Sequence, residues 1–113
     1  MSSKDKRIYL RDILGCIDDI HNFVGDKSFE AYQAEGLISA AVERKVQIIS
    51  EAAYRLGADA EILCPGPDWK GARGMGNVLR HEYNHVSDEV IWKTIKEDLP
   101  PMRDAILKAL SES

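Results

Sequence analysis

A histidine and several basic residues lie within one stretch of the sequence, from Trp69 to His85. His81 can take or give a proton near neutral pH, and Arg73 or Arg80 could stabilise the negative charge that develops on a reacting phosphate. These side-chain types in one place are typical of metal-free RNA cleavage. A histidine beside charged residues is also typical of an ordinary solvated surface, so spacing alone leaves both interpretations open.

The same stretch is more basic than the rest of the chain. Between Trp69 and His85, three lysine or arginine residues stand against one glutamate, a local charge of +2. The whole chain has a formal charge of −4, which leaves −6 for the remainder. The protein therefore has no global basic field that would attract nucleic acid or an anionic membrane, and any contact with RNA must be local.

A helix is the element expected to position these residues. At about 100° per residue, a helix over 69–86 has an apolar side and an opposite polar arc. The apolar residues are Met75, Val78, Leu79 and Val86. The residues of the polar arc are Arg73, Asn77, Arg80, His81 and Asn84. One side of this helix is therefore predicted to join the core, while the other carries the chemistry.

Three glycines lie in this helix, Gly71, Gly74 and Gly76. Each costs roughly 1 kcal/mol relative to alanine, so something must compensate. Close approach of another helix would explain them, and access of a phosphate to the backbone is the functional alternative. Their spacing matches neither a P-loop nor a dinucleotide-binding fingerprint.

Apolar periodicity predicts helices along the whole chain. The expected helices cover residues 8–24, 26 or 28 to about 56, 67 or 68 to 84, 87 or 88 through 95, and 102–110. Glycine ends the first two, the proline-rich segment 64–68 precedes the third, and Pro100 and Pro101 are expected to stop the fourth. The second helix has two apolar stripes, which predicts burial on two sides and a homodimer. The first stripe is Ile38, Val42, Ile49, Ala53 and Leu56, and the second is Leu37, Ala41, Ile48 and Ala52.

These patterns predict an all-α fold, an antiparallel bundle of four to five helices. No segment alternates with strand periodicity, and the connections are short. A length of 113 residues, with 44% hydrophobic and 30% charged residues, favours a single domain over 1–113. The charged N-terminus and the lack of a long apolar run predict a cytoplasmic protein without membrane contact. Cys16 and Cys64 are too few for a disulfide framework or a zinc site.

The chain resembles the HepT-like toxins of the HEPN superfamily over nearly its whole length. The segments that carry the resemblance are WKGARGMGNVLRHEY at 69–83, YLRDIL at 9–14, AVER at 41–44, SEAA at 50–53, VIW at 90–92 and DLP at 98–100. The resemblance implies a HEPN-like helical protomer, a homodimer whose interface forms a cleft, and endoribonuclease activity that needs no metal or other cofactor. The partner it implies is a minimal nucleotidyltransferase antitoxin.

The family's signature is an arginine followed after four to six residues by histidine, commonly continued as His-x-Tyr. His81 and Tyr83 match its second part, whereas Gly76 stands where the signature arginine is expected. Arg80 is too close to His81 for this spacing and Arg73 is too distant. Either one of these arginines supplies the charge from another register, or the protein is a catalytically weakened HEPN binding or scaffold module.

The resemblance assigns a role to each candidate residue. His81 is the acid or base, Arg73 and Arg80 replace the missing charge, and Asn77 orients the substrate. Glu51 and Asn84 are cleft or supporting residues. Tyr83 matches the tyrosine to which the family's nucleotidyltransferase partners attach AMP, although packing of its ring at the core edge is an alternative.

A di-iron helical bundle is a rival hypothesis of another class. The pattern from Glu82 to His85 is one E-x-x-H pair, and Asp18, Asp19 and His21 lie close together in the first helix. A ferritin-like site needs two such pairs and two further glutamates. This hypothesis is therefore disfavoured, and no metal site is expected.

Overall fold

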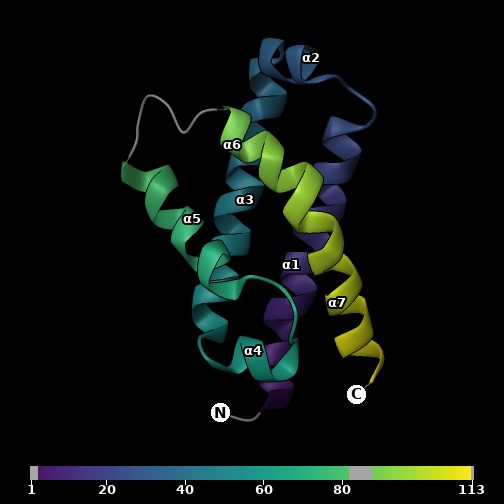
Figure 1. Ribbon diagram of the computed structural model, residues 1–113, viewed down its shortest axis with the longest axis vertical. Helices are drawn as coiled ribbons and strands as arrows, with labels where there is room; N and C mark the ends of the chain where they lie inside the picture. The colour runs from purple at the N-terminus through teal and green to yellow at the C-terminus, as the bar shows by residue number, and fades with distance from the viewer. Residues whose placement is uncertain (1–2, 82–87, 113) are drawn as a thin grey trace.

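The computed structural model describes residues 3–81 and 88–112, and most of them are helical (Figure 1). The elements are α1 (Ser3–Val24), α2 (Phe29–Ala34), α3 (Gly36–Leu56), α4 (Asp59–Leu63), α5 (Trp69–His81), α6 (Asp88–Lys93), the π-helical turn η1 (Thr94–Asp98) and α7 (Leu99–Ser111). The described residues contain no strand, and the all-α prediction is confirmed. None of the helices in this part of the chain is long and apolar enough to cross a membrane.

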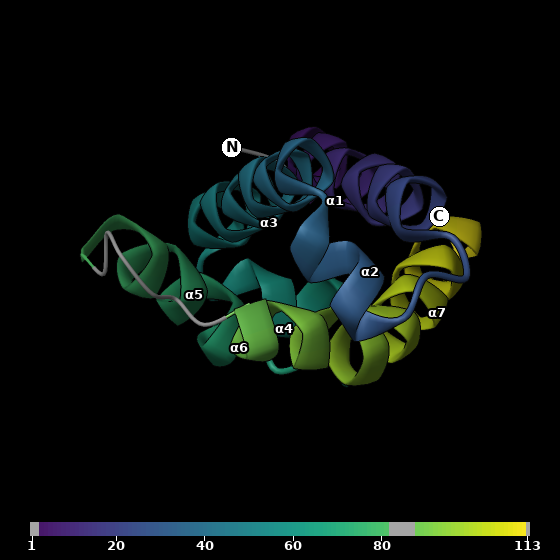
Figure 2. The ribbon, with the colours of Figure 1, turned by 90° about the horizontal axis from the view of Figure 1, so that it is seen from above.

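The long helices run back and forth along the molecule. Helix α1 leads away from the N-terminus, α2 lies at the far end, and α3 returns antiparallel to α1 (Figure 1). Helix α3 packs against α1 and against α5, while α7 packs against α1. Seen from above, α5 lies at the edge of the bundle, with α3 as its main neighbour (Figure 2). In the described part of the chain, α5 is therefore an edge helix that packs mainly on α3.

The buried apolar side chains of the described residues form one cluster, to which all the long helices contribute. Aromatic side chains pack in this core at two places. Trp69, at the start of α5, is 1% exposed, and the ring of Trp92 contacts those of Phe29 and Tyr32. Cys16 and Cys64 are free thiols in this core, and burial raises the pKa of the Cys64 thiol.

The second expected helix is in fact two helices. Of the two expected starts, residues 26 and 28, the structure has Ser28 as the cap of α2, because its hydroxyl accepts a hydrogen bond from the Ala31 N–H at 3.1 Å. Glu35 then leaves the helical conformation, with φ −99° and ψ 89°, and α3 begins at Gly36. Since the short α2 also buries Tyr32, the apolar pattern continues across the break and hides it in the sequence.

The fourth helix ends before Pro100 as predicted, but the last helix begins earlier than the predicted residue 102. Helix α7 begins at Leu99 and includes both prolines in its first turn, where a missing N–H has no partner to lose. The turn η1 joins α6 directly to α7, so these elements follow one another without a loop. The short α4 was not predicted, because its five residues are too few for a periodic pattern.

The protomer covers most of both apolar stripes on α3. The buried residues of the first stripe are Val42, Ile49, Ala53 and Leu56. In the second stripe Ala52 is buried, Ala41 and Ile48 are half-buried, and Leu37 is 89% exposed. An uncovered apolar surface on this stripe is therefore restricted to the N-terminal end of α3.

Candidate functional site

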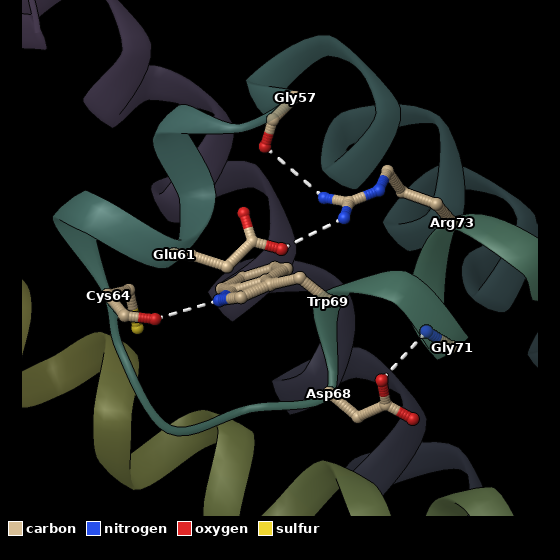
Figure 3. Close-up of polar contacts among 7 residues, drawn as sticks. All are labelled: Gly57, Glu61, Cys64, Asp68, Trp69, Gly71 and Arg73. Atoms are coloured by element: carbon tan, nitrogen blue, oxygen red, sulfur yellow. Dashed lines mark hydrogen bonds and ion pairs between the residues drawn. The ribbon is translucent and has the colours of Figure 1, made fainter.

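The start of α5 is fixed by its first residues and the loop before it (Figure 3). The Asp68 carboxylate accepts a hydrogen bond from the Gly71 N–H at 2.9 Å and so caps the helix. The buried indole of Trp69 donates to the carbonyl of Cys64 at 2.7 Å. A Cβ atom at position 71 would collide with the Asp68 side chain. Gly71 therefore serves the cap, and the helix begins at a well-defined place.

Arg73 ties the first half of α5 to the end of α3 and to α4. Its guanidinium donates to the carbonyl of Gly57 at 3.2 Å and to the carboxylate of Glu61 at 2.9 Å (Figure 3). The hydrogen bond from Arg73 is the main cause that lowers the pKa of the Glu61 carboxyl. The guanidinium thus points towards α4, whereas His81 ends α5 about 12 Å further along the helix.

Ser50 joins α3 to the middle of α5. Its hydroxyl accepts a hydrogen bond from the Gly76 N–H at 2.9 Å and donates to the carbonyl of Arg73 at 3.1 Å. A Cβ atom at position 76 would lie 2.5 Å from the Ser50 oxygen and 3.2 Å from its Cβ. Gly76, which stands where the family's signature arginine is expected, is therefore required by the close approach of α3.

A polar groove runs between α3 and α5, with a volume of about 770 Å³. It is lined by Gln47, Ser50, Glu51, Tyr54 and Arg55 of α3 and by Lys70, Arg73, Gly74 and Gly76 of α5. Three of these side chains are cationic and one, Glu51, is anionic. Glu51 lies 3.6 Å from Arg44. Three cations and one carboxylate leave the lining with a net positive charge. A groove with this lining suits an anionic ligand.

The structure brings two of the predicted site residues, Arg73 and Glu51, to this groove. Asn77, Arg80 and His81 belong to α5 by their backbone, and their side chains lie outside the described part of the structure. Tyr83 and Asn84 also lie outside the described residues.

The sequence analysis did not assign five of the lining residues to a site: Gln47, Ser50, Tyr54, Arg55 and Lys70. The signal for Tyr54 was its spacing, because residues four apart on a helix share a face and Tyr54 follows Ser50 by four. No pattern in the sequence pointed to Glu61, which pairs with Arg73, because this contact depends on how α4 packs after α3.

A second pocket, of about 420 Å³, lies between α3, the start of α5, η1 and α7. Its lining is mostly apolar and includes Val46, Ile49, Met75, Leu99 and Met102. The polar groove and this apolar pocket therefore share α5, and only the groove suits a charged substrate.

No three histidine, cysteine or acidic side chains gather at a metal site among the residues that the structure describes. The acidic residues of the di-iron hypothesis in α1 are paired with cations, Asp18 with Arg103 at 2.7 Å and Asp19 with Lys45 at 2.9 Å. The E-x-x-H pair at 82–85 lies outside the described residues.

Comparison with known proteins identifies the family. A family model described as "Ribonuclease HepT-like" matches residues 13–109. "Putative RNase MJ1380" of Methanocaldococcus jannaschii is 31% identical over 94% of this chain and 97% of its own length. "Probable ribonuclease HepT" of Thermococcus cleftensis is 35% identical over 84% of this chain and 86% of its own length. No solved structure is significantly similar. The chain therefore belongs to the HepT-like ribonuclease family of the HEPN superfamily.

Proposed function

We propose that this chain, as a single domain, is a metal-independent endoribonuclease that acts as a homodimer in the cytoplasm, as the toxin of a toxin–antitoxin system. The names of its relatives support RNA as the substrate. The observation that carries the proposal is the groove between α3 and α5. Three of its side chains are cationic, and it adjoins the turn of α5 that ends at His81.

The proposed reaction is an attack by the RNA on itself. His81 takes the proton from a ribose 2′-hydroxyl, whose oxygen then attacks the neighbouring phosphorus. The bond to the 5′-oxygen of the next nucleotide breaks, and the proton that His81 took passes to that oxygen. Arg80 or Arg73 stabilises the charge on the phosphate oxygens, and Asn77 orients the phosphate. The products are a 2′,3′-cyclic phosphate and a 5′-hydroxyl.

The direct test is to incubate the purified chain with a single-stranded RNA and with DNA of the same sequence, both in excess chelator. We expect the RNA to be cleaved and the DNA to remain intact, because DNA lacks the attacking hydroxyl. Loss of cleavage in chelator, or equal cleavage of the DNA, would reject the mechanism.

A catalytically weakened binding module is the second candidate function. The observation that favours it is the close contact between Gly76 and Ser50, which leaves no room for a side chain at the signature position. Such a module would bind RNA or a nucleotidyltransferase without cleaving RNA. The same incubation separates the two functions, since a module that binds the RNA leaves it intact.

The homodimer is a prediction of its own. The outer side of α5 has no main neighbour other than α3 in the described part of the protomer, and Leu37 leaves an apolar surface at the start of α3. A second copy that covers these surfaces would bring two copies of His81 to one cleft. Light scattering at micromolar concentration is expected to give twice the 12.7 kDa mass of one chain. A mass of one chain at this concentration would remove the shared cleft from the proposal.

Regulation by AMP transfer is the further part of the proposal. A cognate minimal nucleotidyltransferase with ATP is expected to attach AMP to Tyr83, which follows His81 by two positions. The added phosphate and bulk beside the basic residues would repel the RNA and switch off cleavage. Mass spectrometry should locate AMP on Tyr83 and find none in Tyr83→Phe. Modification that persists in Tyr83→Phe would contradict this assignment.

A further inference from the structure

The groove between α3 and α5 holds an aromatic ring that the fold does not use. Tyr54 is one of the residues that line this groove, and it is 76% exposed. In the ranges 3–81 and 88–112 its ring contacts no other aromatic ring. An exposed aromatic face in a polar groove is a platform on which a planar group can stack.

Two cations line the same groove as this ring. Arg55 and Lys70 are exposed, and neither has an ion pair to another described residue. The other two charged side chains of the groove already have partners, since Arg73 binds Glu61 and Glu51 lies beside Arg44. The charges left for a ligand are therefore positive, in a chain whose formal charge is −4.

The wall of the groove on the α5 side is bare at Gly74. A Cβ atom at this position would meet no atom within 4 Å in the described part of the structure. Packing within the protomer therefore does not explain this glycine, in contrast to Gly71 and Gly76. The open space lets a ligand approach the backbone of α5 closely, which a side chain at this position would restrict.

We propose that this groove binds one nucleotide of a single-stranded RNA, with its base stacked on Tyr54 and its phosphate between Lys70 and Arg55. The inference rests on the proposed function, because it describes how the same substrate is held. A single strand fits better than a duplex, whose bases are already stacked on one another. Gly76 is the last described lining residue of α5 and lies about 7.5 Å along the helix from His81, so the bound nucleotide adjoins the one that is cleaved.

RNA binding by the His81→Ala chain tests this inference without cleavage. The probe is a fluorescein-labelled single-stranded RNA of mixed sequence, followed by fluorescence anisotropy. Adding Tyr54→Ala is expected to raise Kd roughly 5-fold or more, because base stacking on an aromatic ring is lost. Tyr54→Phe keeps the ring and should retain binding. The matched control is Ile62→Ala, whose side chain is equally exposed, at 76%, and lies on α4 outside the groove lining.

The salt dependence of binding tests the phosphate contact separately. Lys70→Ala is expected to reduce the slope of log Kd against log salt by about 0.7, the value for one phosphate of a single strand. Lys108→Ala, which removes an exposed lysine of α7, should leave the slope unchanged. Lys70→Ala without a change of slope would overturn the phosphate assignment.

Each of the other possible results either supports or overturns the inference. No binding by the His81→Ala chain, or equal binding by its Tyr54→Ala variant, overturns it. A halved mass of Tyr54→Ala in light scattering would also overturn it, because the groove would then be a contact between two copies. If binding behaves as expected but the native chain leaves RNA intact, the inference stands and the proposed nuclease fails. If the native chain cleaves RNA and Tyr54 has no effect on binding, only the inference fails.

Discussion

Replacing His81 with alanine is expected to lower the rate of RNA cleavage by roughly 10²- to 10⁴-fold, the usual contribution of a general acid or base. The imidazole is the one group of the predicted site whose ordinary pKa lies near neutrality, so no neighbour can take over the proton transfer. Initial rates on a fluorescent RNA, measured in chelator, give the effect. The thermal unfolding midpoint of His81→Ala should match that of the native chain. A rate within a few-fold of the native rate would remove His81 from the mechanism.

The two arginines need a comparison that separates catalysis from folding. Arg73 holds Gly57 and Glu61, so Arg73→Ala disturbs the end of α3 as well as the groove. Glu61→Gln removes the same ion pair and leaves the guanidinium in place. If Arg73 supplies the charge, Arg73→Ala should slow cleavage while Glu61→Gln does not. If Arg80 supplies it, only Arg80→Ala should cause a large loss.

Gly76→Ala is expected to lower the free energy of unfolding by about 1–3 kcal/mol, the usual cost of an added group in a filled space. The new Cβ would lie 2.5 Å from the Ser50 hydroxyl oxygen, so α5 must move away from α3 or break its hydrogen bond. Intrinsic helix propensity predicts the opposite sign, since alanine is favoured over glycine by roughly 1 kcal/mol. Urea unfolding of the two proteins gives the difference directly.

Gly74→Ala is the matched control, two positions away on the same helix. A Cβ there meets no atom of the described structure within 4 Å, so the gain in helix propensity should raise the free energy of unfolding by about 0.5–1 kcal/mol. Equal shifts for the two variants would show that the contact between Ser50 and Gly76 does not matter. The contact also means that Gly76→Arg cannot restore the family signature without a change at Ser50.

Much of the fold could be predicted from the sequence because local signals coincide with it. Gly25 and Gly57 end α1 and α3 with φ of +56°, a conformation that favours glycine, and Ser28 caps α2 as expected. The break at Glu35 could not be predicted, because both α2 and α3 bury apolar residues and the pattern is continuous. Pro100 lies in the first turn of α7 and not before the last helix as expected, since a proline can begin a helix as well as end one.

The candidate site was less accessible to prediction than the fold. The sequence left two explanations open for the glycines of α5, the approach of another helix and the access of a phosphate. The approach of a helix is confirmed at Gly76 but not at Gly74. The bond from Arg73 to Glu61 depends on how the chain turns after α3, which periodicity does not describe. Tyr54 gave no chemical signal of its own, because an aromatic residue on a helix is usually part of the core.

Identification of the RNA ends after cleavage tests the central claim most directly. The purified chain is incubated with one synthetic RNA in chelator, and mass spectrometry determines both new ends of each product. We expect a 2′,3′-cyclic phosphate on the upstream fragment and a 5′-hydroxyl on the downstream fragment, because the 2′-oxygen of the RNA is the attacking group. A 3′-hydroxyl with a 5′-phosphate would mean that water attacks instead, and would contradict the proposed reaction.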